Sequence, residues 1–225
     1  MAEGNVMQNG FLSGETRLKK HETRALQTPG DVLEFWYGDG ATNPDTLGAR
    51  QKMWFQKSDD TDRLIARKGV DLLARLASGE AHKWAAIGPA ERLAAIIALD
   101  QFTRNIFRDS AAAFEKDALA LQLCKQGLDA GDDQAITPVK RAFFYLPLEH
   151  SESLEDQERC VGLFKTLVKD VDDAHRGLAE SWLEYARKHR EVIEKYERFP
   201  HRNAALDRIS TRAENDYLAK PGAGF

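Results

Sequence analysis

The sequence contains little cysteine and no long apolar run. Only two of its 225 residues are cysteines, Cys124 and Cys160, and each lies on the apolar face of a helical pattern. This excludes a small disulfide-rich secreted domain and predicts two reduced core thiols. No apolar stretch approaches the roughly 18 residues that a membrane-spanning helix needs, and the first residues lack the hydrophobic core of a signal peptide. We therefore expect a cytoplasmic protein without a membrane partner.

An excess of positive charge is also absent. The 32 lysines and arginines are outnumbered by 36 aspartates and glutamates, which gives a formal net charge of -4 and an isoelectric point near 5.9. Charges of both signs are spread along the chain, whereas a nucleic-acid-binding protein usually concentrates basic side chains on one face. The composition therefore predicts no nucleic-acid partner, and a hydrophobic content of 42% is enough for a sizeable core.

The short motifs of several common chemistries are missing as well. The sequence has no HExxH, no CxxC pair and no calcium-loop spacing, so we expect no metal site. It has no GxSxG nucleophile elbow, and the adjacency of Ser151 to His150 does not define a catalytic triad. A GxxxxGKS phosphate loop is also lacking, and no other feature indicates a cofactor.

Strand signals are absent, because no segment alternates apolar and polar residues between hairpin turns. Helix signals recur instead: Thr28 before Pro29 opens a helical pattern that Gly38 ends, and a long pattern covers residues 173–196. The other predicted helices are Ser58 to Gly79, Ser110 to Gly131, and four that begin at Gly88, Thr137, Ser153 and Thr211. Because the connections are short, we predict an all-α fold, a compact array of antiparallel helix pairs.

The chain divides into two parts by composition. Residues 1–27 are polar, glycine-containing and aperiodic, so we expect a flexible N-terminal arm. No linker interrupts the remainder, where proline and glycine only separate helical patterns, and we predict one helical domain over residues 28–225. A 34-residue period, which marks tetratricopeptide repeats, is not evident.

Charged groups lie on the face of one helical pattern that should be buried. In ALDQFTRNIF, Asp100 and Arg104 share a stripe with Leu93 and Ile97, while Gln101 lies beside them. Since an isolated buried charge costs several kcal/mol, we expect Asp100 and Arg104 to pair at their i,i+4 spacing. The pair is either a structural ion pair or part of a cleft in which Arg104 receives an anion.

Two further segments combine polar and apolar groups in the same way. In RAFFYLPLEHSE, Pro147 should kink or end a helix just before the polar pair Glu149 and His150. On the long helix, His189 lies in a buried seam whose other members are Leu178, Trp182, Tyr185, Val192 and Tyr196. That helix leads into ERFPHRN, where polar groups crowd around a proline.

We expect these three segments to converge, because one shared network can satisfy buried polar groups that would be costly separately. The candidate ligand-binding residues are Asp100, Gln101, Arg104, Glu149, His150, His189, His201, Arg202 and Asn203. The candidate catalytic residues are Glu149, His150, His189 and His201.

Several separated motifs resemble one family. LDQFTRN, YLPLEHSE, KHREVIEKYERFPHRN, LDRISTRAE and the ending LAKPGAGF occur here in the order of an uncharacterised, mainly bacterial domain-of-unknown-function family, grouped with tetratricopeptide-like (TPR-like) helical proteins. The resemblance covers Pro29 to Phe225 and implies a compact right-handed array of paired helices without an established activity. Thr103 and Asp207 depart from the family's proline and glycine at those positions. The matched signature positions are Asp100, Gln101, Arg104, Glu149, His150, Ser151, Glu152, His189, Arg198, Phe199, Pro200, His201, Arg202 and Asn203.

The leading functional hypothesis is a cytoplasmic helical binding protein. Its central polar pocket would hold a small anionic ligand or an acidic peptide end, with Arg104 and Arg202 as receptors. His150, His189 and Asn203 would adjust the hydrogen bonding, and TPR-like scaffolds commonly bind peptides.

Two alternatives belong to other classes. In the first, the protein is a hydrolase of a small phosphorylated or acylated metabolite, with Glu149 or His150 as general base and His189 or His201 as acid. In the second, the polar cluster only locks helices together and the protein is a structural interaction scaffold. The sequence also leaves a homo-oligomer open.

Overall fold

The computed structural model describes residues 24–41 and 43–224, so most of the predicted arm lies outside the described residues. Every regular element in this part of the chain is helical, which confirms the predicted fold class. The α-helices are α2 (Pro29–Tyr37), α3 (Pro44–Phe55), α4 (Asp59–Arg75), α5 (Ala81–Ile87), α6 (Pro89–Ile97), α7 (Thr103–Ile106), α8 (Asp117–Ala130), α9 (Pro138–Glu149), α10 (Leu154–Asp170), α11 (Asp173–Tyr196) and α12 (Arg212–Leu218). The π-helical turns are η1 (Leu76–Glu80) and η2 (Ala98–Phe102), and the 3-10 turns are η3 (Ala111–Ala113), η4 (Asp132–Ala135) and η5 (Pro200–Arg202).

Local sequence explains where several helices begin. Thr28 and Asp31 form a reciprocal capping box at the start of α2, in which the Asp31 N–H donates to Thr28 Oγ1 at 3.2 Å. The Ser58 hydroxyl caps α4, and Thr211 and Glu214 form a second capping box at α12. These observations confirm the starts that the sequence predicts.

One predicted helix start was wrong, one capping interaction is absent and one helix was missed. The Ser110 hydroxyl bonds back to the Phe107 carbonyl at 2.7 Å instead of capping a helix, so α8 begins only at Asp117. The predicted start at Ser153 was right, since α10 begins at Leu154, but the Ser153 side chain makes no capping hydrogen bond, and Asp156 accepts from Ser151 Oγ. The helix α3 was not predicted at all.

Pro147 acts more mildly than the sequence suggests. The helix α9 continues through it and ends at Glu149. Because Pro147 lies in the last turn, the helix loses one backbone hydrogen bond close to where it ends in any case. Gly79 ends the α4 pattern as predicted, since its φ of 109° turns the chain from η1 into α5.

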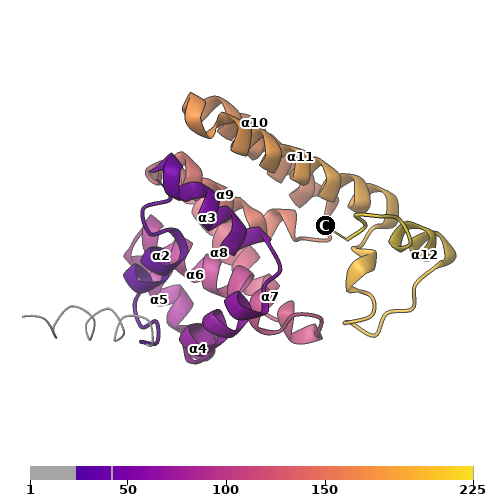
Figure 1. Cartoon of the computed structure of the whole chain (residues 1–225), viewed down its shortest axis with the longest axis horizontal. Coiled ribbons are helices and arrows are strands. Elements are labelled where there is room, and N and C mark those ends of the chain that lie inside the picture. The colour runs from indigo at the N-terminus through magenta and orange to yellow at the C-terminus, as the bar shows by residue number, and fades with distance from the viewer. Residues whose placement is uncertain (1–23, 42, 225) are drawn as a thin grey trace, which may run out of the picture.

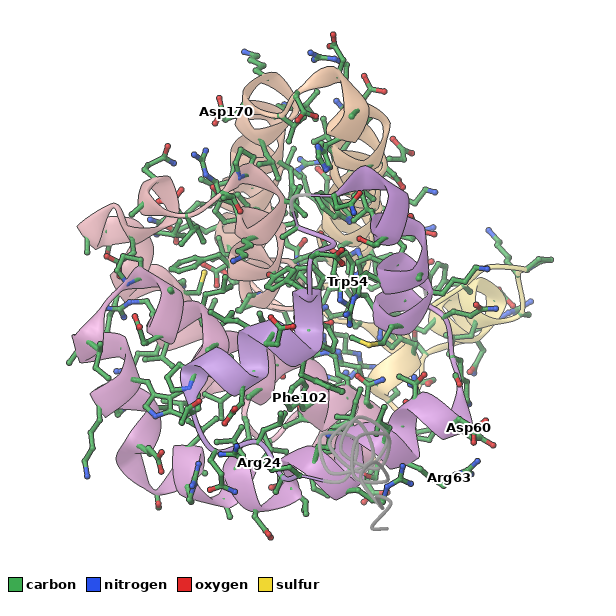
Figure 2. All side chains as sticks on the ribbon, turned by 60° about the vertical axis from the view of Figure 1, so that its left-hand side comes forward. Arg24, Trp54, Asp60, Arg63, Phe102 and Asp170 are labelled. Carbon is green, nitrogen blue, oxygen red and sulfur yellow. The ribbon has the colours of Figure 1, made fainter. Side chains whose placement is uncertain are left out.

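The segment α6–η2 is the centre of the core. Every residue from Leu93 to Thr103 is buried, as its apolar pattern on all sides predicts. Trp36 of α2 packs against it and against α9, with ring centroids 5.6 Å from both Phe102 and Phe143. Figure 2 shows Trp54 of α3 and Phe102 in the interior, whereas Asp60 and Arg63 of α4 extend from the surface.

The helices α10 and α11 form an antiparallel pair that packs on α9 and lies along one side of the molecule in Figure 1. Glu197, with a φ of 57°, ends α11 and starts the chain towards η5 and α12. Such pairing agrees with the predicted array, and its relation to TPR proteins stays a prediction. None of the helices in the described ranges combines the length and the apolar composition that a membrane-spanning segment needs.

Candidate functional site

Asp100 is the most buried charged residue of the predicted site. It lies in the π-turn η2, and only 1% of its surface is exposed. Gln101 Nε2 donates to Asp100 Oδ2 at 2.6 Å, His150 Nδ1 lies 2.8 Å from Oδ1, and Arg104 Nη1 lies 3.1 Å from Oδ1. Burial alone would raise the pKa of Asp100, but Arg104 and His150 hold it well below its ordinary value. The predicted ion pair of Asp100 and Arg104 is therefore confirmed.

Arg104 makes its strongest contacts with a carboxylate that the sequence did not indicate. Its guanidinium binds Asp117 with two hydrogen bonds, from Nη1 at 2.9 Å and from Nη2 at 3.0 Å. Nη1 also donates to the Asp100 carbonyl at 2.6 Å. Asp117 begins α8, and an acidic residue in a first turn is common enough that nothing in its position marks it as a partner.

Arg202 brings the third segment to the same place. Its Nη2 donates to the His150 carbonyl at 2.9 Å, and Nη1 lies 3.5 Å from Asp117 Oδ2. The guanidinium stacks between two rings, 4.5 Å from Phe199 and 4.8 Å from Phe114. Burial, and then Arg104, lower the pKa of Arg202 to about 10, so it stays charged at neutral pH. The predicted convergence of the three segments is thus observed.

The neighbouring residues His201 and Asn203 make contacts within their own segment. The His201 ring packs on Phe199 at 5.5 Å, and burial, followed by Arg202, lowers its pKa to about 4. Asn203 Nδ2 donates to Ser210 Oγ at 3.0 Å, and its carbonyl accepts from the Arg208 N–H at 2.8 Å. Asn203 therefore closes the loop between η5 and α12.

Other signature positions tether that loop to the helices. Glu152 accepts from the Phe199 N–H at 2.8 Å and from both terminal nitrogens of Arg208 at 2.8 and 3.0 Å. Arg198 binds the Glu214 carboxylate at 2.6 and 2.8 Å. Both carboxylates therefore hold the segment after α11 in place.

A pocket of about 360 Å³ opens beside the ion-pair network. Five of the nine predicted ligand-binding residues line it, namely Gln101, Arg104, Glu149, His150 and His189. The same polar wall includes Asn105 and Arg108, which were not predicted. The rest of the lining is largely aromatic and aliphatic, formed by Trp54, Phe55, Leu146, Leu178, Trp182 and Tyr185. Asp100, His201, Arg202 and Asn203 do not line the pocket.

Glu149 is the acid of this pocket. Only 5% of its surface is exposed, and its closest ionisable contact is His189 Nδ1, 3.4 Å from Oε1. Burial, and then the negative charge of Asp100, raise the pKa of Glu149 to about 8. Glu149 is therefore mostly protonated at neutral pH, and its contact with His189 joins two neutral groups.

The two pocket histidines are held as neutral rings. Burial, and then Arg104, lower the pKa of His150, while burial, and then His150, lower that of His189 to about 3. His150 Nδ1 donates to Asp100, so Nε2 of the neutral ring carries a lone pair. His189 Nδ1 donates to the Tyr185 carbonyl at 2.9 Å.

Both guanidinium groups of the wall have carboxylate partners. Arg104 binds Asp117 and Asp100, as described above. Arg108 binds Asp62 through Nε and Nη2, each at 2.8 Å, and Asn105 donates to the same carboxylate at 2.8 Å. Asp62 lies in the first turn of α4, and sequence spacing alone could not connect it with a pocket.

The seam predicted on α11 is only partly buried. Trp182, His189 and Val192 are buried, Leu178 and Tyr196 are half-buried, and 47% of Tyr185 is exposed. Tyr185 reaches the pocket mouth instead of the core.

As for metals, no group of three or more His, Cys, Asp or Glu side chains in the described residues could hold an ion.

The arrangement can therefore hold a small molecule in contact with both aromatic rings and hydrogen-bonding groups. Glu149 can donate or accept a proton near neutral pH, and His150 can accept a hydrogen bond at Nε2. Arg104 and Arg108 are already paired with carboxylates, and these ion pairs help to hold the pocket wall in place.

Comparison with known proteins agrees with the sequence resemblance. A solved structure, that of a protein of unknown function, ATU0120 from Agrobacterium tumefaciens, is 32% identical in sequence; the match covers 86% of this chain and 97% of that one, with a TM-score of 0.70. No curated protein matches. The model of the family described as "Bacterial protein of unknown function (DUF924)" matches residues 32–222. This chain therefore belongs to the DUF924 family of bacterial proteins of unknown function.

Proposed function

We propose that the protein binds a small molecule in the pocket beside Glu149 and His150. The observation that carries this proposal is the composition of the wall: α3, α7, α9 and α11 bring aromatic rings and buried polar groups to one cavity of about 360 Å³. Pockets of this size and mixed lining are typical of small-molecule sites. A folded peptide segment would need a longer groove, so a compact ligand suits the volume better.

Whether the ligand can be an anion depends on whether the arginines of the pocket wall are free to bind it. A bound anion or acidic peptide end would approach Arg104, whose guanidinium already makes two hydrogen bonds with Asp117. Such a ligand would compete for Arg104 with the Asp117 carboxylate, which is part of the protein and cannot diffuse away. Arg104 then contributes rigidity to the wall, as the structural interpretation of the ion pair supposes.

Filling the pocket tests the proposal without disturbing the ion pairs. Ser181 is exposed and lines the pocket, so Ser181→Trp should occupy it. The control is Glu180→Trp, a change at the neighbouring exposed position on α11. Thermal unfolding of both variants and the parent protein is measured against a panel of amines, carboxylates, phosphate esters and nucleotides.

A ligand of the pocket raises the unfolding midpoint of the parent protein and of Glu180→Trp, because it binds only the native state. It leaves Ser181→Trp unchanged. If every compound that raises the midpoint does so equally in Ser181→Trp, the pocket is not the binding site.

A second candidate function is supported by the pair of Asp100 and His150. A carboxylate behind Nδ1 orients an imidazole so that Nε2 can act as a base, and Glu149 lies beside it as an acid. We propose hydrolysis of an acylated or phosphorylated metabolite as the alternative. Turnover of nitrophenyl esters or phosphates that is lost in both His150→Asn and Ser181→Trp would support it, and turnover that survives both changes would exclude this site.

A further inference from the structure

The carboxyl group of Glu149 is unusual among the acids around the pocket. Asp62, Asp100 and Asp117 each contact an arginine within 3.1 Å. Within the described part of the chain, Glu149 contacts no arginine or lysine, and its ionisable contact is the neutral His189. Among the described residues, the pocket therefore contains one carboxyl group without a cationic partner.

The charges around this carboxyl group favour a positive ligand. Arg104 and Arg108 are neutralised by their carboxylates, which leaves no excess positive charge in the wall. Asp100 lies close enough to act on Glu149 and remains ionised. A cation beside Glu149 would thus be attracted by Asp100 and, once it has displaced the proton of Glu149, by that carboxylate as well, whereas an anion would be repelled by Asp100.

The remaining wall suits an apolar body with a positive end. Trp54, Trp182 and Tyr185 line the pocket together with Leu146 and Leu178. Aromatic rings attract ammonium groups through their negative faces and also bury flat apolar surface. Trp54 is held in place, because its Nε1 donates to the Trp36 carbonyl at 2.9 Å.

We propose that the ligand is a primary or secondary amine carried on a planar apolar group, with its ammonium against Glu149 and its apolar group against Trp54, Trp182 and Tyr185. This inference rests on the proposed function and names the ligand class of the same pocket. It replaces the expected anion by a cation, because the arginines that would receive an anion are already paired.

Binding of such an amine releases a proton from Glu149. Its pKa of about 8 in the free protein means that the carboxyl is mostly protonated at neutral pH, and the ammonium group requires the ionised form. Affinity therefore increases as the pH rises towards about 8 and then levels off.

The other titratable groups around Glu149 do not produce this pH dependence. They come from the segments packed at its side chain: Asp100 of η2, His150 directly after α9, Cys160 of α10 and His189 of α11. The pKa values of Asp100, His150 and His189 are lowered, and burial raises that of Cys160 well above its ordinary value. All four keep one protonation state between neutral pH and pH 8.

The test uses three probes of matched shape: phenethylammonium, 2-phenylethanol and 3-phenylpropionate. Isothermal titration of the full chain at pH 7, in two buffers of different ionisation enthalpy, measures affinity and proton release together. The variants are Glu149→Gln, which keeps the shape of the side chain, and Tyr185→Leu, which removes a ring at the exposed mouth. Glu180→Gln on the exposed face of α11 is the control.

We expect phenethylammonium to bind best, to release a proton, and to lose about tenfold or more of its affinity in Glu149→Gln, as for the loss of a charged hydrogen bond. Tyr185→Leu should weaken it less, and Glu180→Gln should leave it unchanged. Equal or tighter binding of 3-phenylpropionate or 2-phenylethanol would refute the proposal that the ligand is an amine. The proposal that the pocket binds a small molecule would still stand. Failure of all three probes, and of the wider panel above, would overturn the pocket itself.

Discussion

Glu149 links the stability of the protein to pH. Its pKa is raised from an ordinary value of 4.5 to about 8 in the folded chain, so the folded state retains a proton that the unfolded state loses. The contribution of this group is complete below about pH 4.5 and is lost as the pH rises to about 8. We expect Glu149→Gln to gain stability relative to the parent protein across this range, because glutamine does not ionise.

Thermal unfolding of both proteins at intervals from pH 5 to pH 8 measures the effect. Each kcal/mol of difference should shift the Tm by about 2–4 °C in a chain of this size. A Tm difference that stays constant, or that changes in favour of the parent protein at higher pH, would show that Glu149 is ionised in the fold.

Arg104 and Arg108 offer a comparison of two ion pairs in one wall. Arg104 connects the buried Asp100 with Asp117, so Arg104→Leu should cost about 3–5 kcal/mol by leaving buried negative charge without its partner. Arg108→Leu should cost about 1 kcal/mol, because Asp62 is nearer the surface and keeps its bond with Asn105. Urea unfolding of both variants tests this, and equal losses would contradict a special role for Arg104.

At the scale of helices, close packing requires Gly127 in α8. A Cβ at this position would lie 2.4 Å from Phe144 Cζ and 2.6 Å from Arg92 Cδ. Gly127→Ala should therefore destabilise the protein by about 1–3 kcal/mol, although alanine is the better helix former. Gly162→Ala in α10 is the matched control, since nothing lies within 4 Å of its Cβ, and it should stabilise by about 0.5–1 kcal/mol. Unfolding midpoints of the two variants that move in the same direction would refute this packing argument.

The sequence predicted helices well where caps and apolar spacing agree, as at α2, α4 and α12. It failed at α3, where Gly48 and a weak apolar pattern hide a helix that tertiary packing stabilises, chiefly through Trp54. It also failed to show the π-turn η2, because the spacing of Asp100 and Arg104 is the same in either kind of turn. Backbone type there is decided by the surrounding core rather than by local preference.

At the scale of the whole molecule, Glu152 fastens the C-terminal segment to the helices. It accepts hydrogen bonds from Phe199 and Arg208, so Glu152→Ala should free residues 198–215 while the helical core stays intact. Amide hydrogen exchange should accelerate in that segment and remain unchanged in α6 and α9. The exposed Glu155→Ala is the control, and uniform acceleration throughout the chain would show that Glu152 supports the whole fold instead.

The convergence of the three polar segments was predictable, because buried polar groups need one another. The structural role of each residue within these segments was not predictable. Arg202 and Asn203 became part of the framework because Asp117, Phe114 and Ser210 supply partners from segments that the sequence does not connect with them. Glu149 became the distinctive group of the pocket because it lacks a cationic partner among the described residues, and such an absence cannot be inferred from spacing.

The most direct measurement is therefore a carbon-13 NMR titration of the carboxyl group of Glu149, assigned by comparison with Glu149→Gln. We expect a midpoint near pH 8 in the free protein, and a shift to lower pH when phenethylammonium binds. A midpoint near the ordinary value of 4.5 would contradict the raised pKa of Glu149. A midpoint that stays unchanged while phenethylammonium binds would contradict an ion pair between Glu149 and the ligand.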